Sequence, residues 1–495
     1  MAVFYDFKKQ FSQIVSETCP FLRSIEFEIW HFIIGRRYSS NSIGVYLLNP
    51  FTWLQSMVSG DTLPSYPEVK LSIVTQFYPP DYAATGQLIE ELATHLAKRG
   101  LKVRILTGQP GYAFEKESAP TIERVGRVLI QRSCISRVWG RRIRGRVLNG
   151  LVFLVRAGLR LFRPSNRGDV LLITSEPPYL PVLGYLANLC FGVPYVCVLY
   201  DLYPDIAVKL DVISRKHWLV RLWHAINQRV WQRASRIVVL SSSMKARLVD
   251  RCPAIAKQIS VIHNWADPTQ ISPIEKSENW FAQKFDLVKK FTVLYSGNLG
   301  RCHDIETTIS TIQQLQDETI QFVFIGNGAK RQTFVDRVEA LGLSNCKFLP
   351  YQEKHCLPYS LTACDLSLVS LGEGMEGLVA PSKFYTALAA GRPILAICER
   401  HSYLHDLISE ANCGATFEHG DCAGIAKFIR HLAANREQAE QMGRAGRHYL
   451  QANFTPEIVA QQYSEVLDQT LAQQMGASPL PSARHRIPQS DVAIR

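Results

Sequence analysis

The stretch KLSIVTQFYPPDYAATGQLIEELATHLAKRGLKVRILTGQPG, residues 70–111, contains a complete β-α-β unit. Residues 70–80 form an apolar run that is typical of a buried strand, and residues 88–100 have the apolar spacing of a helix that ends at Gly100. Residues 101–111 form a second apolar run. Because a helix between two such strands is the usual crossover of a parallel pair, this stretch predicts a parallel sheet.

The same alternation continues along the chain. Apolar strands are expected within residues 169–178, 193–205, 235–248 and 258–267, with a helix at 179–192. After a polar stretch, a second alternating series begins at Phe291. We therefore expect an α/β protein with two doubly wound, Rossmann-like domains that face a central cleft, and ligands at the carboxyl ends of the strands.

This pattern divides the chain into six parts, whose boundaries follow changes in composition and periodicity. They are a poorly patterned N-terminal extension (1–67), an N-terminal Rossmann-like domain (68–268), a linker (269–290), a C-terminal Rossmann-like domain (291–452), a crossover helix (453–475) and a tail rich in Pro, Ser, Ala and Arg that we expect to be disordered (476–495).

Composition and charge narrow the class of protein. The chain has 47% hydrophobic and 20% charged residues, which is ordinary for a globular protein, and its 12 cysteines contain no Cys-x-x-Cys pair. The first residues lack the pattern of a secretory signal, so a reducing cytosol is expected. The net charge is +12, and ten arginines without any lysine or acid lie between Arg132 and Arg167. An anionic partner is therefore expected.

The uncharged run from Tyr179 to Tyr200 allows two interpretations. Its 22 residues are enough to span a bilayer. Gly192 and Pro194 interrupt the run where a turn between a helix and a strand is expected, which favours a buried helix followed by a strand.

The arginine-rich segment RRIRGRVLNGLVFLVRAGLRLF, residues 141–162, has near-helical spacing of apolar residues. Such a helix is suited to an anionic membrane surface, with its apolar side inward and its arginines at lipid phosphates. The alternatives are nucleic-acid binding, for which the chain has no motif, and a packed helix with a basic outer face. The predicted membrane-surface residues are Arg141, Arg142, Arg144, Arg146, Arg156 and Arg160.

Three loops have the composition of phosphate or sugar sites. Gly86 follows the first strand, and the loop YSGNLGR, which ends at Arg301, follows a strand of the second series. The third is APSKFYTALAAGRPILAI, residues 380–397, in which Ser382 would cap or open a helix and Lys383 would join its free amides in binding a diphosphate. Each allows a purely structural interpretation as a turn, a cap or a surface charge.

Taken together, six motifs resemble the nucleotide-sugar glycosyltransferases of bacterial surface-polysaccharide and colanic-acid type assembly, over about residues 69–470. The motifs are VTQFYPPDYAATGQ (74–87), LYDLYPDIAV (199–208), VIHNWAD (261–267), LYSGNLGRCHD (294–304), FIGNG (324–328) and PSKFYTALAAGRP (381–393). The resemblance implies a GT-B fold, a UDP- or GDP-sugar donor bound mainly by the second domain, an acceptor bound mainly by the first, and a retaining transfer without a metal.

The resemblance also assigns donor-binding residues, matched motif by motif. They are Gly86, Asn298, Gly300, Arg301, Gly326, Gly328, Ser382 and Lys383. The chain departs from relatives that carry a Glu-x7-Glu signature, because Leu378 and Thr386 stand at those two positions.

Other carboxylates could replace that pair. Glu376 and Glu399 are candidate donor-binding residues, with Glu373 nearby, although each could equally be a solvated loop carboxylate. Asp201 and Asp205 close a buried strand of the first domain and are the candidate catalytic residues, where a carboxylate could orient an acceptor hydroxyl or act as its base. Asp205 could instead cap a helix.

The function predicted from the sequence is that of a glycosyltransferase of the EC 2.4 class, extending a lipid-linked oligosaccharide at the inner face of the plasma membrane. We expect it to be cytoplasmic and peripheral, with no cofactor besides the nucleotide-sugar substrate, no nucleic-acid partner and no metal, since no two aspartates stand in an Asp-x-Asp pattern. The alternatives are a nucleotide-sugar epimerase of the same fold and a catalytically silent sugar-nucleotide-binding subunit.

Overall fold

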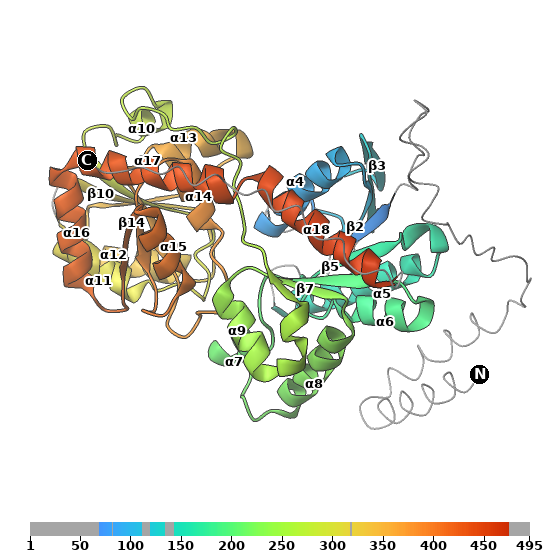
Figure 1. Ribbon diagram of the computed structural model, residues 1–495. Helices are drawn as coiled ribbons and strands as arrows, with labels where there is room; N and C mark the ends of the chain where they lie inside the picture. Colours follow the sequence, from blue (N-terminus) through green and yellow to red (C-terminus); the bar gives the residue numbers. More distant parts are fainter. Residues whose placement is uncertain (1–68, 82, 111–118, 134–142, 317–318, 475–495) are drawn as a thin grey trace, which may run out of the picture. The chain divides into compact units, whose positions relative to one another are not determined.

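A computed structural model describes residues 69–81, 83–110, 119–133, 143–316 and 319–474. Within these residues, two mainly parallel sheets are each covered by helices on both faces (Figure 1). This arrangement confirms the prediction of two doubly wound α/β domains. The predicted N-terminal extension and C-terminal tail lie outside the described residues.

The first sheet has eight strands in the order β3-β4-β2-β1-β5-β6-β7-β8, and all neighbours are parallel except the β3–β4 hairpin. The strands are β1 (Lys70–Val74), β2 (Lys102–Gly108), β3 (Ile122–Val125), β4 (Val128–Ser133), β5 (Val170–Thr174), β6 (Tyr195–Leu199), β7 (Arg236–Val239) and β8 (Ile259–Val261). Its helices are α4 (Ala84–Lys98), α5 (Ile143–Leu161), α6 (Val182–Phe191), α7 (Asp205–Lys209), α8 (Trp218–Arg233) and α9 (Ser242–Arg251), with short 3-10 turns η1 (Pro164–Asn166) and η2 (Pro253–Gln258).

The second sheet has six parallel strands in the order β11-β10-β9-β12-β13-β14. The strands are β9 (Phe291–Ser296), β10 (Ile320–Ile325), β11 (Cys346–Leu349), β12 (Leu366–Ser370), β13 (Ile394–Ile397) and β14 (Gly414–Phe417). The helices from the linker onward are α10 (Trp280–Lys284), α11 (Glu306–Gln314), α12 (Arg331–Ala340), α13 (Leu357–Thr362), α14 (Lys383–Ala389), α15 (Tyr403–Ala411), α16 (Cys422–Ala434), α17 (Arg436–Asn453) and α18 (Pro456–Gln474), with η3 at Lys354–Cys356.

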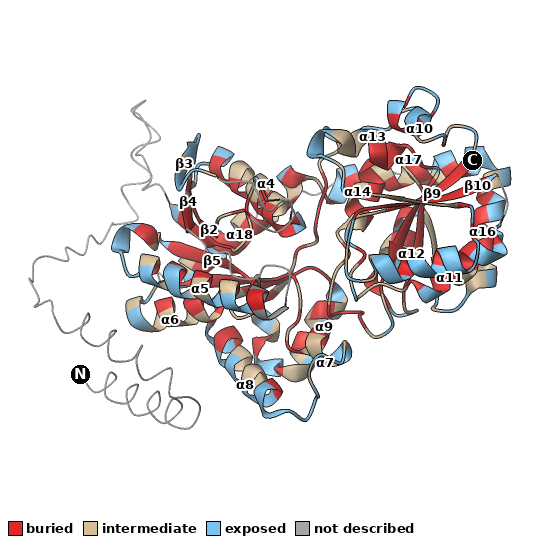
Figure 2. Ribbon diagram, turned by 180° about the vertical axis from the view of Figure 1, so that it is seen from behind, coloured by how far each residue is buried: buried red, intermediate tan, exposed pale blue. Residues whose placement is uncertain are grey.

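Burial explains why the central strands read as continuous apolar runs. Every residue of β5, β6, β10 and β12 is buried, because helices cover both faces of each sheet. Figure 2 shows the strands as the buried layer and the outer faces of the helices as the exposed one. In contrast to these buried central strands, β3 at the edge of the first sheet is largely exposed.

The uncharged run at residues 179–200 folds as a helix and a strand. It contains α6 and β6, and Gly192 ends α6 in the left-handed conformation with φ of +71°. The interpretation as a helix followed by a strand is therefore confirmed. β6 is buried throughout, whereas α6 is buried only at Leu183, Gly184 and Ala187. Among the residues that the structure describes, no helix is both long and apolar enough to cross a membrane.

The end of the described chain returns to the first domain. α17 packs on α14, and Gly443 makes the close approach possible, since a Cβ there would lie 2.1 Å from the carbonyl oxygen of Gly391. α18 then packs against α4, β5 and β6 of the first sheet. The two domains are thus held together by α18 as well as by their loops.

Candidate active site

The loops that follow β9 and β10 are pressed together at the carboxyl edge of the second sheet. Gly326 has φ of +128°, and a Cβ there would lie 2.2 Å from the carbonyl oxygen of Gly297. A Cβ at Gly328 would lie 2.4 Å from the carbonyl oxygen of Leu299. Packing of one loop against the other therefore requires glycine at both predicted positions, independently of any ligand.

The β9 loop carries the other predicted diphosphate residues. The backbone carbonyl of Asn298 accepts a hydrogen bond from the Tyr295 hydroxyl at 2.7 Å, which fixes the start of the loop. Gly300 follows, and Arg301 is exposed, so its guanidinium remains accessible to an anion. The ring of His303 is held by the end of β12, because its Nδ1 lies 2.7 Å from the carbonyl oxygen of Ser370. Burial and the nearby ammonium of Lys383 lower the pKa of His303 to about 3, so its ring is neutral.

Lys383 lies beside this loop at the first position of α14. Its Nζ is 5.1 Å from the centre of the Tyr295 ring, and a Cβ at Gly297 would lie 2.7 Å from its Cε. Burial lowers the pKa of Lys383 to about 8. Among the described residues, no carboxylate lies within ion-pair distance of this ammonium. A partly buried cation without an acidic partner favours an anionic ligand at this place.

Of the two predicted roles of Ser382, opening the helix is confirmed and capping it with the side chain is wrong. Ser382 precedes the helix with φ of −62° and ψ of −21°, and its hydroxyl makes no capping hydrogen bond. A capping residue usually has extended dihedral angles, which bring its hydroxyl back to the free amides. Thr386, at one position of the Glu-x7-Glu signature, donates a 3.0 Å hydrogen bond to the carbonyl of Lys383 and so supports the first turn.

The three candidate glutamates of the second domain have different surroundings. Glu373 is exposed, as a solvated carboxylate would be. Glu376 is only 2% exposed, and its Oε2 is buried without a hydrogen-bond partner, so the interpretation as a solvated loop residue is wrong for Glu376. Glu399 accepts a 2.7 Å hydrogen bond from the backbone amide of Gly374, and its other oxygen lies 3.3 Å from Nε2 of His401. Glu399 therefore orders the loop between β12 and α14.

In the first domain the structure brings together two carboxylates, of which the sequence prediction named one. Asp201 follows β6 and Glu176 follows β5, and these strands are parallel neighbours. Burial raises the pKa of Asp201 to about 6. Burial and the charge of Asp201 raise the pKa of Glu176 to about 7, against a hydrogen bond from the Thr85 side chain. One oxygen of Glu176 is buried without a partner, so it can accept a ligand hydroxyl or carry a proton.

Glu176 was missed although the sequence contained the signal. It ends the apolar run DVLLITSEPP in the same way that Asp201 ends the next strand. Parallel strands place both ends at one edge of the sheet.

Gly86 lies in the first turn of α4, close to this pair. A Cβ there would lie 3.1 Å from the backbone of Phe77 and Tyr78, so glycine allows the loop after β1 to pack on the helix. Thr85, next to Gly86, is the residue that donates to Glu176. Gly86 thus sets the approach of helix and loop at this edge of the sheet.

Asp205 is not brought together with Asp201. It begins α7, where Pro204 and not Asp205 is the capping residue, and its carboxylate forms a 2.7 Å ion pair with Arg251 of α9. His224 lies 3.9 Å from the same oxygen. The geometry therefore gives Asp205 a structural contact between helices.

One loop of the second domain joins the edge of the first sheet. The backbone amide of Leu202 donates to the carbonyl of Leu378 at 2.9 Å, and Asp201 forms an antiparallel bridge with Val379. Arg247 of α9 donates to the carbonyl of Glu376 at 2.7 Å. The carboxyl edges of the two sheets are therefore in direct contact through residues 376–379.

The predicted membrane-surface arginines divide into three groups. Arg141 and Arg142 lie outside the described residues, as do the side chains of Arg144 and Arg146. Arg156 is exposed on α5. Arg160 contradicts its prediction, because its guanidinium donates to the carbonyls of Gln131 and Arg132 at 3.1 and 2.8 Å and so holds α5 to the end of β4.

The raised pKa of Glu176 predicts a pH-dependent stability. Between its ordinary pKa of 4.5 and its folded value of about 7, the folded protein keeps a proton that the unfolded chain releases. The free energy of unfolding should therefore fall as pH rises through this range, by on the order of 3 kcal/mol. Glu176→Gln keeps the side chain neutral, so urea unfolding should show a smaller loss of stability between pH 5 and pH 8.

Glu278→Gln, at an exposed glutamate, is the control and should keep the pH dependence of the unchanged protein. An identical pH dependence for Glu176→Gln and the unchanged protein would contradict the assignment of a buried, protonated Glu176.

Two known proteins are similar to this chain in sequence. The chain is 29% identical over 313 residues to the probable glycosyltransferase WbjE of Pseudomonas aeruginosa, covering 62% of this chain and 76% of that protein. It is 24% identical over 341 residues to the putative colanic acid biosynthesis glycosyl transferase WcaI of Escherichia coli, covering 67% and 83%.

Solved structures agree in fold at lower identity. Sucrose-phosphate synthase from Thermosynechococcus elongatus has a TM-score of 0.66 at 17% identity, covering 82% of this chain and all of that one. Anabaena HepE in complex with UDP-glucose has a TM-score of 0.59 at 16% identity, covering 81% and 99%.

Two family models match consecutive parts of the chain. Residues 85–270 match glycosyltransferase family 4, and residues 276–449 match glycosyl transferases group 1. Together they cover more than two thirds of the chain. The chain therefore contains a family 4 and a group 1 glycosyltransferase domain in succession, and it is a sugar-transferring enzyme of the EC 2.4 class with the GT-B fold.

Proposed function

We propose that this enzyme transfers a sugar from a UDP- or GDP-sugar to a lipid-linked oligosaccharide during the synthesis of a surface polysaccharide. The observation that carries the donor assignment is the ammonium of Lys383, which lies beside the β9 loop with no described carboxylate in ion-pair distance. A diphosphate is the anion that a nucleotide-sugar brings to such a cation. The complex of HepE with UDP-glucose and the name of WcaI, a putative colanic acid biosynthesis enzyme, support the donor and the pathway class.

Lys383, the exposed Arg301 and backbone amides of the β9 loop would stabilise the negative charge on the leaving diphosphate. Stabilisation by these groups requires no metal ion. Among the described residues, no group of three His, Cys, Asp or Glu side chains could hold a metal ion.

We predict that sugar transfer continues in the presence of a chelator. A loss of activity with EDTA would contradict this prediction.

Asp201 and Glu176 are proposed to bind the acceptor hydroxyl. Their pKa values of about 6 and 7 leave a proton on one of the pair near neutral pH, so one member can donate and the other accept. In a retaining transfer the departing phosphate takes the acceptor proton on the same face of the sugar, so neither carboxylate needs to act as a nucleophile. The pair would orient the hydroxyl for this step.

The donor assignment is tested with Lys383→Ala. Loss of the ammonium should lower kcat/KM for the nucleotide-sugar about a hundredfold, because the charge that develops on the diphosphate loses its nearest cation. Transfer to a lipid-linked acceptor and release of nucleotide are measured together with each donor. The control is Lys289→Ala, at an exposed lysine, which should retain activity.

Three outcomes would overturn parts of this proposal. Equal activity of Lys383→Ala and the unchanged enzyme would remove the donor assignment. Conversion of the nucleotide-sugar without any acceptor would favour epimerisation. Nucleotide binding without turnover of any donor would favour a silent subunit.

We also propose that α5 attaches the enzyme to the membrane surface. Its inner face is buried at Phe153, Ala157 and Leu161, yet a second apolar stripe is exposed along the helix. The stripe comprises Leu148, Leu151, Val155, Leu159 and Phe162, with exposed fractions of 44, 43, 54, 59 and 46%. α6 packs against both α5 and α8, and α8 exposes Trp218 and Leu222 as well. An exposed apolar stripe beside arginines is suited to the membrane interface.

Val155→Asp tests the membrane contact. Placing a charge in the middle of the stripe should lower binding to vesicles of phosphatidylcholine and phosphatidylglycerol by about tenfold, measured by flotation. The control is Leu341→Asp, because Leu341 is 40% exposed on the second domain. Equal binding of the two variants would contradict the role of α5.

A further inference from the structure

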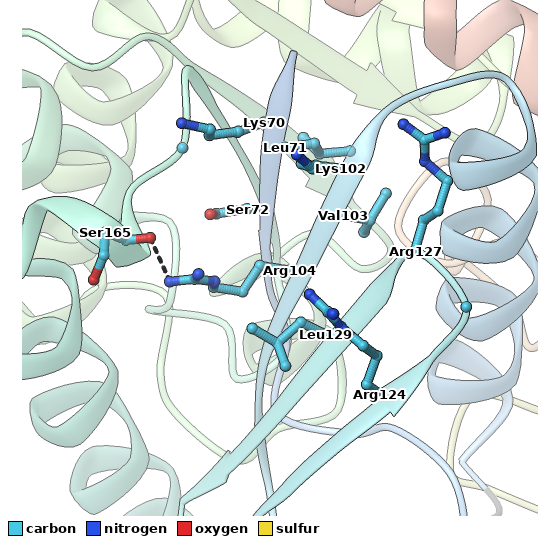
Figure 3. Close-up of a pocket in the computed structure, with 12 residues that line it drawn as sticks. Lys70, Leu71, Ser72, Lys102, Val103, Arg104, Arg124, Arg127, Leu129 and Ser165 are labelled. Carbon is cyan, nitrogen blue, oxygen red and sulfur yellow. Dashed lines mark hydrogen bonds between the residues drawn. The ribbon is translucent and has the colours of Figure 1, made fainter. Parts of the chain in front are cut away.

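A pocket lies at the other end of the first sheet, at the amino ends of β1 and β2. Its volume is about 340 Å³, and Figure 3 shows it between these strands, the β3–β4 hairpin and the turn after α5. None of the described residues that line it is Asp or Glu. Its cations are Lys70, Lys102, Arg104, Arg124 and Arg127. The active-site loops leave the opposite ends of the strands, so this pocket is a separate site.

Arg104 is held in a fixed position in this pocket. Its Nη1 donates to the carbonyl oxygen of Ser165 and to Oδ1 of Asn166. Asn166 is positioned in turn, because its carbonyl accepts a 2.9 Å hydrogen bond from the Ser72 hydroxyl. All of these partners are neutral. The guanidinium is therefore oriented without an ion pair to any described carboxylate.

Two of the exposed cations around Arg104 also have no acidic partner among the described residues. Neither Lys70 nor Arg124 forms an ion pair with a described carboxylate. The carboxylate of Asp169 is nearby, but it accepts a 2.7 Å hydrogen bond from the backbone amide of Lys70. Like charges concentrated in a concave surface repel one another, and a bound anion removes that repulsion.

We propose that this pocket binds a phosphate group. A phosphate oxyanion accepts hydrogen bonds from several directions, as donors on β1, β2 and the β3–β4 hairpin would supply, and arginine suits its geometry. The volume also lies in the range of small-molecule pockets, whereas a nucleic acid would need an extended basic surface.

Two sources can supply this phosphate. One is the headgroup of an anionic lipid, since Phe162 at the end of the exposed α5 stripe precedes the turn that carries Ser165. The other is a soluble phosphate ester. The phosphate site itself does not depend on the proposed donor, acceptor or membrane contact.

The experiment compares the full chain with the double variant Arg104→Ala/Arg124→Ala in two arms. The first arm measures binding of glycerol phosphate by calorimetry, and the second measures flotation with phosphatidylglycerol vesicles. The control, Lys289→Ala/Lys427→Ala, removes two exposed lysines outside the first domain and changes the net charge equally. Arg124→Ala alone, at an exposed residue, keeps the test valid if loss of Arg104 disturbs the turn.

We expect the dissociation constant for glycerol phosphate to rise at least about tenfold in the pocket variants and to stay unchanged in the control. Binding should persist in Lys383→Ala, which separates this pocket from the donor site. A loss of vesicle binding specific to the pocket variants would identify the lipid as the source, and a loss confined to glycerol phosphate would identify a soluble ester. If the pocket variants match the control in both arms, the phosphate site is refuted.

Discussion

The backbone contact between Leu202 and Leu378 is the constraint on which the arrangement of the site depends. Leu202 lies shortly after the end of β6, and Leu378 lies in the loop between β12 and α14. The amide of Leu202 donates to the carbonyl of Leu378. All strands of the second sheet are parallel, and so are the inner strands of the first sheet. The loops that follow these strands therefore lie at the carboxyl edge of their sheet. This hydrogen bond and the adjacent bridge from Asp201 to Val379 join the two edges. Asp201, which follows β6, is thereby joined to the loop that leads from β12 to Lys383.

This constraint also gives a physical reason for the departure from the Glu-x7-Glu pattern. Leu378 is 3% exposed and its carbonyl takes part in the contact between domains, while Thr386 supports the first turn of α14. Both positions therefore have structural roles in this chain. The nearby Glu376 is buried with one unpartnered oxygen, and Glu399 orders the loop through the amide of Gly374.

Much of the fold could be predicted from the sequence, because it depends on local patterns. The helix and strand at residues 179–200 follow from Gly192 and Pro194, and the β-α-β unit follows from apolar periodicity. The β3–β4 hairpin was not predicted, since the exposed β3 has no apolar run. In the site, the positions of the glycines were predicted from the sequence. The need for glycine there arises from the contact of one loop with another, which involves residues far apart in sequence. The inward turn of Arg160 and the pairing of Glu176 with Asp201 likewise depend on tertiary neighbours that periodicity does not describe.

The most direct test of the central claim is a crystal structure of the full chain with UDP or GDP bound. The account predicts diphosphate density within hydrogen-bond distance of Lys383 Nζ and the amides of the β9 loop, on the side of the second sheet that contacts Asp201. Diphosphate density at another place, with Lys383 not engaged, would contradict it.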